Sequence, residues 1–279
     1  MIELNHDCQD SGSRPRVNSR HGRRSGTTTL LASGLLALSL TALATSPARA
    51  QSTGVHPEAA RLLKRMTEFV GSQDRFSLQT VNTVEVVLDS GQKIQFTGGA
   101  RTTVQRPNKL HSERVGDVMS QSFYYDGQTV TLVNPDDGYF ATVPAPSTID
   151  GMLDFAREEL DVVAPAGDLI TMDAYGRLMS DARSGFVVGK SYVDGVRCDH
   201  LAFRGYGVDW QIWIEDGDRP VPRKYVITTV DMEQAPQAEI LVTGWNTSPG
   251  VGAKQFEYSP PAGARQIEFV ALDSTGEQP

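Results

Sequence analysis

The sequence predicts an α+β fold whose main element is an antiparallel sheet long enough to curl. The first observation is the order of the patterns along the chain, which runs helix, strands, helices, strands. The second is the alternation of apolar and polar residues with a period of two in many short runs. The third is the turn signals between those runs, among them Asp126-Gly127, Asp194-Gly195 and Asp216-Gly217.

Residues 1–50 are expected to be a secretory signal peptide and not part of the fold. A basic start at residues 20–24 is followed by an uncharged apolar run at residues 27–44 and by the small-x-small pattern Ala48-Arg49-Ala50. The apolar run is too short and wrongly flanked for a membrane-spanning helix. We therefore predict cleavage near Ala50 and a periplasmic mature protein, with export either by the general or by the twin-arginine route.

The acidic balance of the chain argues against nucleic acid as a partner. The whole chain has a formal net charge of −8, and without residues 1–50 it has 20 basic and 31 acidic residues, a net charge of −11. Such a surface also disfavours stable binding to anionic membranes.

Cys198 is the only cysteine beyond the predicted signal peptide, so the mature chain cannot form an internal disulfide. We expect a buried, inert thiol.

One amphipathic helix is expected near the start of the mature chain. A disordered lead-in is predicted over residues 51–56. Pro57 suits the first turn of a helix because its missing N–H has no partner there in any case. From that point the apolar side chains recur every three or four positions as far as Gly71, which predicts a helix over residues 57–71.

The remaining elements are predicted from shorter patterns. Alternation in residues 76–88 and 93–105 predicts a long hairpin, in which Gly98-Gly99 suggests a bend or bulge. Before the later strands the pattern is helical: Ser147 can cap a helix, and a second short helix is predicted over residues 166–181. The other predicted strands cover residues 110–117, 120–127, 128–135, 138–146, 185–194, 196–205, 208–216, 222–232, 238–246, 254–260 and 265–272.

Two stretches of this sequence resemble known families. The run SFYYDGQTVTLVNPDDGYFATVPAP at residues 122–146 resembles the LolA/LolB superfamily of periplasmic lipoprotein carriers. The run VDGVRCDHLAFRGYGVDWQIWIEDGDRPVPRKYVIT at residues 193–228 resembles a narrower group, the periplasmic family named domain of unknown function 2092. The closing GWNTSP and FEYSPPAGA are similar to that family too. The resemblance covers residues 57–270 and leaves residues 271–279 as a C-terminal tail.

The resemblance implies a LolA-like fold. This is a strongly curved antiparallel sheet, an open half-barrel, with helices over its concave face. In the carriers, the hollow between the sheet and the helices holds acyl chains. A shared fold supports a binding role only by analogy, and the resemblance implies no catalytic activity. We therefore expect a soluble protein that binds a lipid, a lipidated segment or another apolar ligand, without a cofactor and without enzymatic activity.

Cys198, Asp199 and His200 are residue types that build nucleophilic and metal sites. In a strand, Cys198 and His200 share one face about 7 Å apart, while Asp199 points to the other face. A zinc site needs three or four ligands, and neither His56 nor His111 has a ligand-like spacing to this pair. Side chains two apart also point in parallel, which suits a Cys–His nucleophile poorly. We predict no metal and no catalytic residue here, and an unrecognised hydrolase stays open as an alternative.

Apolar residues on both faces of segment 208–214 favour a strand that is covered on both sides or lines a cavity. The helical stripes add flexible methionine side chains that suit an adaptable apolar ligand. The predicted cavity residues are Phe76, Leu78, Ile94, Phe96, Met152, Phe155, Trp210, Ile212 and Ile214. Ordinary core packing is the alternative for each of them.

A second functional hypothesis is an envelope protein-interaction or sensing module without a ligand, and under either hypothesis we expect a monomer.

Overall fold

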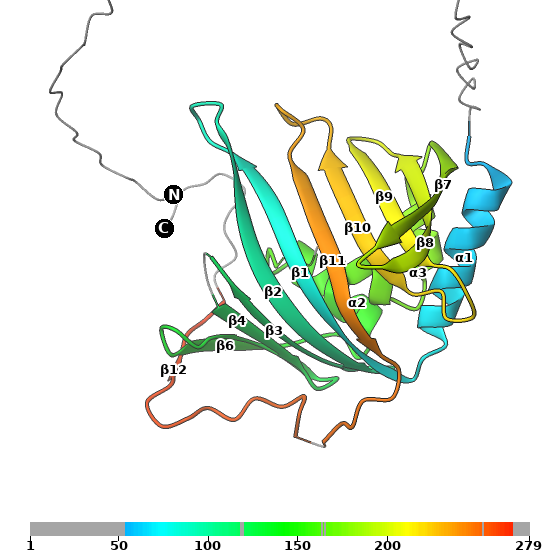
Figure 1. Cartoon of the computed structure of the whole chain (residues 1–279). Coiled ribbons are helices and arrows are strands. Elements are labelled where there is room, and N and C mark those ends of the chain that lie inside the picture. The colour runs from blue at the N-terminus through cyan, green and yellow to red at the C-terminus, as the bar shows by residue number, and fades with distance from the viewer. Residues whose placement is uncertain (1–53, 118–119, 163, 165, 253, 270–279) are drawn as a thin grey trace, which may run out of the picture. The chain divides into compact units, whose positions relative to one another are not determined.

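The computed structural model describes residues 54–117, 120–162, 164, 166–252 and 254–269. The predicted signal peptide, residues 51–53 of the lead-in and the predicted C-terminal tail lie outside these residues. One large sheet dominates the described part (Figure 1). Its strands are β1 (Arg75–Val87), β2 (Lys93–Gln105), β3 (Lys109–Gly116), β4 (Ser120–Tyr125), β5 (Thr129–Asn134), β6 (Tyr139–Pro144), β7 (Ser184–Val193), β8 (Val196–Arg204), β9 (Val208–Glu215), β10 (Pro222–Thr229), β11 (Gln237–Asn246) and β12 (Arg265–Gln266).

The sheet is strongly curved and does not close on itself, as Figure 1 shows. Its order is β12-β6-β5-β4-β3-β2-β1-β11-β10-β9-β8-β7, so β12 and β7 are the outermost strands. All neighbouring strands are antiparallel except β12 and β6. The predicted α+β half-barrel is therefore confirmed. The predicted bulge at Gly98-Gly99 is absent, because the register of β1 and β2 is continuous there. The glycines instead allow β2 and β3 to approach each other closely, since a Cβ on Gly98 would lie 3.2 Å from the Cα of Gly116.

Helix α1 (Pro57–Gly71) has the predicted bounds. The Glu58 N–H donates to Nδ1 of His56 at 3.3 Å, which caps the first turn. The buried residues Leu63, Met66 and Val70 form the apolar face, which packs toward β7 and β9. Before the helix, the His56 N–H donates to the carbonyl of Gly185 at 2.8 Å, so the end of the predicted lead-in pairs with β7.

The central helical segment differs from its prediction in two details. Helix α2 (Ile149–Glu158) is capped by Thr148 and not by Ser147, because the Thr148 hydroxyl accepts from the Gly151 N–H. The predicted second helix is split into η1 (Gly167–Ile170), a single 3-10 turn, and α3 (Ala174–Ser180). The cause of the split is Asp150, whose carboxylate accepts the Met172 N–H at 3.0 Å and takes it out of helical pairing. Among the described residues, no helix is long and apolar enough to cross a membrane.

The predicted strand at residues 254–260 is not a strand. The segment crosses the outer face of the sheet, where Phe256 is buried and the Tyr258 ring packs against Tyr124 and Phe140. Side-chain burial thus holds it without a hydrogen-bond ladder, and Pro260 and Pro261 cannot donate to one. The predicted strand at 265–272 is reduced to β12 among the described residues.

Candidate ligand cavity

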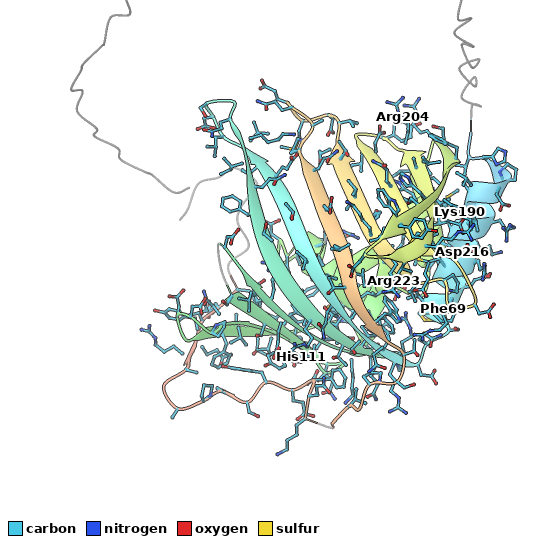
Figure 2. All side chains as sticks on the ribbon, in the orientation of Figure 1. Phe69, His111, Lys190, Arg204, Asp216 and Arg223 are labelled. Carbon is cyan, nitrogen blue, oxygen red and sulfur yellow. The ribbon has the colours of Figure 1, made fainter. Side chains whose placement is uncertain are left out.

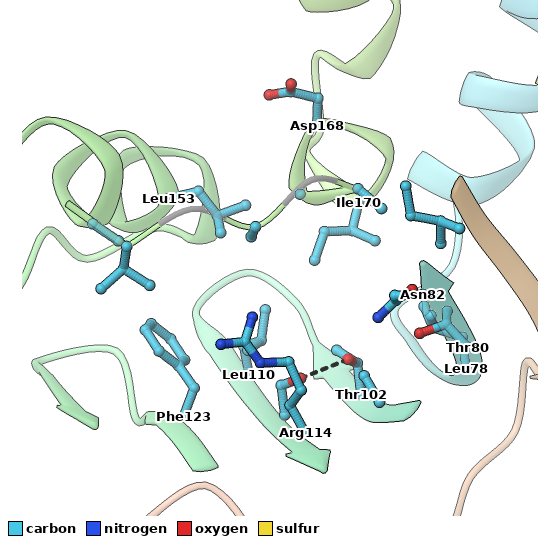
Figure 3. Close-up of a pocket in the computed structure, with 18 of the residues that line it drawn as sticks. Leu78, Thr80, Asn82, Thr102, Leu110, Arg114, Phe123, Leu153, Asp168 and Ile170 are labelled. Atoms are coloured by element: carbon cyan, nitrogen blue, oxygen red, sulfur yellow. Dashed lines mark hydrogen bonds between the residues drawn. The ribbon is translucent and has the colours of Figure 1, made fainter. Parts of the chain in front are cut away.

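A cavity of about 350 Å³ lies between the concave face of the sheet and the segment that runs from α2 to η1. Figure 3 shows the sheet as its floor and the helical segment as its roof. The floor residues are Leu78, Thr80, Asn82, Ala100, Thr102, Leu110, Ser112, Arg114, Gln121, Phe123 and Ile240. The roof residues are Leu153, Ala156, Arg157, Val162, Ala164, Ala166, Gly167, Asp168 and Ile170.

The floor is built in rows across β1, β2, β3 and β4, because paired residues in adjacent strands share a face. The row at the closed end, where the roof is attached, is buried and apolar apart from the Tyr125 hydroxyl, and its Leu110 lines the cavity. The next row mixes apolar and hydroxyl side chains, and the third is mostly polar. In strand order the rows are Phe76, Val104, Leu110 and Tyr125; then Leu78, Thr102, Ser112 and Phe123; then Thr80, Ala100, Arg114 and Gln121.

Small side chains explain why this part of the concave face is hollow. In the floor, Ala100 and the hydrogen-bonded pair Thr102–Ser112 (2.8 Å) are too short to reach the roof. In the roof, Ala156 and Ala166 face the same space. Protein interiors are otherwise packed to the density of organic crystals, so a void of this size needs such a local deficit of side-chain volume.

Ion pairs tie the roof into one unit. Both carboxylate oxygens of Asp154 in α2 accept from Arg177 in α3, at 2.6 and 2.7 Å. Arg157 also donates to Asp154 at 2.7 Å and lies 3.7 Å from Asp168 in η1. The hydrogen bond from Arg177 is the main reason why the pKa of Asp154 lies below its usual value. The three short helical elements are therefore cross-linked to one another.

The roof is attached to the sheet at the closed end of the floor. The Tyr125 hydroxyl donates to the carbonyl of Pro146, just before α2, at 2.5 Å. Nη2 of Arg106 donates to the carbonyl of Ile170, at the end of η1, at 2.8 Å. Both bonds lie beside the buried apolar row, so they fix the base of the cavity.

The nine predicted cavity residues fall into four places. Leu78 lies on the cavity wall. Ile94 and Phe96 lie on the same face of β2 as the floor, farther along the hairpin, and Phe155 is half-buried on α2 away from the wall. The others are buried in the filled core: Phe76, Met152, Trp210, Ile212 and Ile214. The pattern of the sequence did not single out the polar wall residues, Asn82 and Arg114 among them.

The fold separates Cys198, Asp199 and His200. Cys198 is fully buried, and burial raises the pKa of its thiol. Asp199 is on the other face of β8 and pairs with Lys190 at 2.7 Å. Lys190 also pairs with Asp216 at 3.0 Å, and Figure 2 labels these two residues. The thiol, carboxylate and imidazole therefore do not converge. Within the described ranges, no group of three or more His, Cys, Asp or Glu side chains is placed to hold a metal ion.

His200 lies on the outer face of the sheet. Its ring stacks on Trp213 with centroids 4.0 Å apart, and Nε2 is 3.0 Å from Oε1 of Gln211. Burial, more than any neighbour, lowers the pKa of His200, and burial lowers the pKa of His111 as well. Burial thus favours the neutral form of both rings.

Acidification below about pH 6.5, the ordinary imidazole pKa, should destabilise the protein. Below this pH His200 and His111 become protonated in the unfolded chain but stay neutral in the folded chain, because burial lowers their pKa there. The free energy of unfolding therefore falls with falling pH until the pKa values of the folded state are reached. The slope is at most about 1.4 kcal/mol per pH unit for each histidine. Urea unfolding between pH 8 and 5 measures it, and His200→Gln should reduce the slope. An unchanged slope in His200→Gln would show that this ring is not responsible.

Several solved structures are similar to this chain at low levels. LprF from Mycobacterium bovis is 15% identical, with a TM-score of 0.46 over 71% of this chain and 98% of that chain. Lipoprotein LppX from Mycobacterium tuberculosis is 12% identical, with a TM-score of 0.44 over 70% and 99%. A LolA superfamily protein from Nitrosomonas europaea is 11% identical, with a TM-score of 0.33 over 72% and 97%. No ligand or activity follows from similarities this low.

A family model gives the firmer result. Curated proteins yield no match to the sequence. The model for domain of unknown function 2092, described as a predicted periplasmic protein, matches residues 59–270. That range takes in nearly all of α1, every strand of the sheet and the whole cavity. The chain therefore belongs to the family of predicted periplasmic proteins named domain of unknown function 2092.

Proposed function

We propose that this protein is a periplasmic binding protein that holds an apolar ligand or a lipid chain in the cavity between β1–β4 and the α2–η1 roof. The observation that carries the proposal is the cavity itself, whose volume of about 350 Å³ falls within the range of small-molecule pockets. Leu78, Leu110 and Phe123 in the floor and Leu153 and Ile170 in the roof supply apolar contacts from both sides. The predicted signal peptide at residues 1–50 is the proposed means of export.

The contrast between the two ends of the concave face supports this reading. At the β8–β10 end, the same face carries Trp210, Ile212 and Tyr225, all buried in contact with other core residues. At the β1–β4 end, short side chains leave the space empty. Large side chains can therefore fill the concave face of this fold. The hollow at the β1–β4 end results from the short side chains that this sequence has there.

A separate apolar strip lies on the same face of the β1–β2 hairpin, beyond the row that holds Asn82 and Gly98. Val84 is paired with Phe96, and Val86 with Ile94, on the face that also carries Leu78 and the rest of the floor. Val84 and Val86 are 38% and 39% exposed. Exposed apolar side chains grouped in this way are typical of an interaction site, such as a ligand-binding groove. We propose that the strip contacts an apolar part of the ligand that lies beyond the polar rows.

Two experiments test the proposed function. Native mass spectrometry of protein purified from periplasm should show a co-purifying apolar molecule. Titration of delipidated protein with N-phenyl-1-naphthylamine, a neutral apolar fluorophore, should give a saturable rise in fluorescence that dodecan-1-ol reverses. A protein that carries no apolar molecule and binds neither compound would refute the proposal, and in that case a pull-down from envelope extract would address the alternative of a protein-interaction module.

A further inference from the structure

The polar third row of the cavity floor presents an unpaired positive charge. Arg114 on β3 lines the cavity, and Figure 3 shows its guanidinium in the space between floor and roof. In the described part of the chain its one hydrogen-bond partner is Oε1 of Gln121, at 3.2 Å, and no carboxylate pairs with it. A guanidinium has five N–H donors, so most of the donors of Arg114 are available to a ligand. The other cavity arginine, Arg157, is already paired with Asp154 and Asp168.

A second polar group faces the same space. The side-chain oxygen of Asn82 on β1 is buried, and no described residue forms a hydrogen bond with it. Asn82 lines the cavity one row beyond Arg114, where its cross-strand neighbours Gly98 and Gly116 have no side chains. A buried amide without a partner is unfavourable unless something bonds to it. Whichever way the amide is oriented, a polar group of a ligand can satisfy it.

We propose, on the basis of the proposed function, that the ligand is an amphiphile whose head carries anionic oxygens. Arg114 binds the head with charge-assisted hydrogen bonds, and Asn82 contributes a further polar contact. The apolar part lies under the roof, between Leu110 and Phe123 below and Leu153 above. The arrangement of the cavity supports an amphiphilic ligand, because the polar row lies on one side and the apolar side chains lie deeper, toward the closed end.

The net charge of the protein makes a preference for anionic over neutral and cationic heads a specific test of Arg114. The chain has a formal net charge of −8, so its overall field repels anions and attracts cations. A preference for an anionic amphiphile must therefore come from the local guanidinium and not from the surface. Asp168 is the one carboxylate among the described wall residues, and it lies 3.7 Å from Arg157. A cationic head would meet Arg114 with no free carboxylate on that wall to receive it.

Competition against N-phenyl-1-naphthylamine tests the inference with four probes of equal chain length. Dodecanoate and dodecyl phosphate should displace the fluorophore at lower concentrations than dodecan-1-ol, and dodecyltrimethylammonium should be the weakest. Arg114→Gln should weaken both anions by about ten- to a hundredfold, and dodecan-1-ol by much less. The matched control is Arg101→Gln, which removes an exposed arginine from the outer face of β2 and should leave all affinities unchanged.

The outcomes separate the two proposals. If dodecan-1-ol binds but the anions bind no better, or if Arg114→Gln weakens all probes equally, the anionic head is wrong and the apolar cavity stands. If only one anion is preferred, the head is identified as carboxylate or phosphate. If no probe binds to a folded protein, both proposals fail. Thermal unfolding of each variant shows whether a loss of affinity is a loss of fold.

Discussion

Replacement of Ala100 by tryptophan should strongly weaken the binding of N-phenyl-1-naphthylamine while the protein remains folded. Ala100 lies in the third row of the floor, between Thr80 on β1 and Arg114 on β3, with its methyl group toward the cavity. An indole there occupies space that the native chain leaves empty, so it competes with the ligand without the strain of overpacking a filled core. The fluorophore then loses the burial of one large apolar group, which weakens its binding by about 2–3 kcal/mol, or roughly 30- to 150-fold in Kd. Fluorescence titration and thermal unfolding measure the two effects.

The matched control for Ala100→Trp is Arg101→Trp. Arg101 is the next residue of β2, and it is exposed on the opposite face of the sheet. A tryptophan there adds the same side chain to the same strand but outside the cavity, so the affinity should not change. Equal losses in the two variants, or an undiminished affinity in Ala100→Trp, would show that the probe does not bind in this cavity.

Truncation of Trp210 to alanine should destabilise the protein by about 3–5 kcal/mol. Trp210 is 6% exposed, stacks on Phe203 with centroids 4.0 Å apart and meets the edge of Tyr225 at 6.0 Å. Its removal leaves a void that neighbouring strands cannot close. Urea unfolding at neutral pH measures the loss as a lower midpoint with an unchanged slope.

Trp213 provides the comparison on the same strand. It lies on the outer face of β9, half-buried, beneath His200 and with Nζ of Lys224 5.3 Å from its ring centroid. Trp213→Ala removes one stacking contact and one cation–π contact, each worth about 0.5–1.5 kcal/mol. A loss in Trp213→Ala as large as that in Trp210→Ala would contradict the assignment of the two rings to opposite faces.

Local periodicity predicted most of the sheet and helix α1. The alternation in segment 208–214 predicted a strand with apolar residues on both faces, and Trp210 and Trp213 do lie on opposite faces of β9. The same alternation predicts that Asp199 points away from Cys198 and His200, and the ion pair of Asp199 with Lys190 confirms it. Patterns of this kind depend only on neighbours in the sequence, which is why they are readable from one chain.

Other features depended on contacts between residues far apart in the sequence. The break between η1 and α3 follows from Asp150, which is 22 residues before its partner Met172. The segment around Phe256 carries strand-like alternation, but packing on the outer face decides its conformation. The cavity depends on the register of four strands, which brings Leu78, Thr102, Ser112 and Phe123 into one row. No single segment holds that information, so the wall residues could not be predicted together.

The most direct test of the central claim is the location of a bound apolar molecule by solution NMR. With dodecan-1-ol bound to protein labelled at its methyl groups, intermolecular NOEs should connect the chain to Leu78, Leu110 and Ala156, which line the cavity from both sides. Val81, which is 41% exposed on the outer face of β1, should give none. NOEs to Val81 or to other outer-face methyl groups, without any to the three cavity residues, would contradict the claim that this cavity is the binding site.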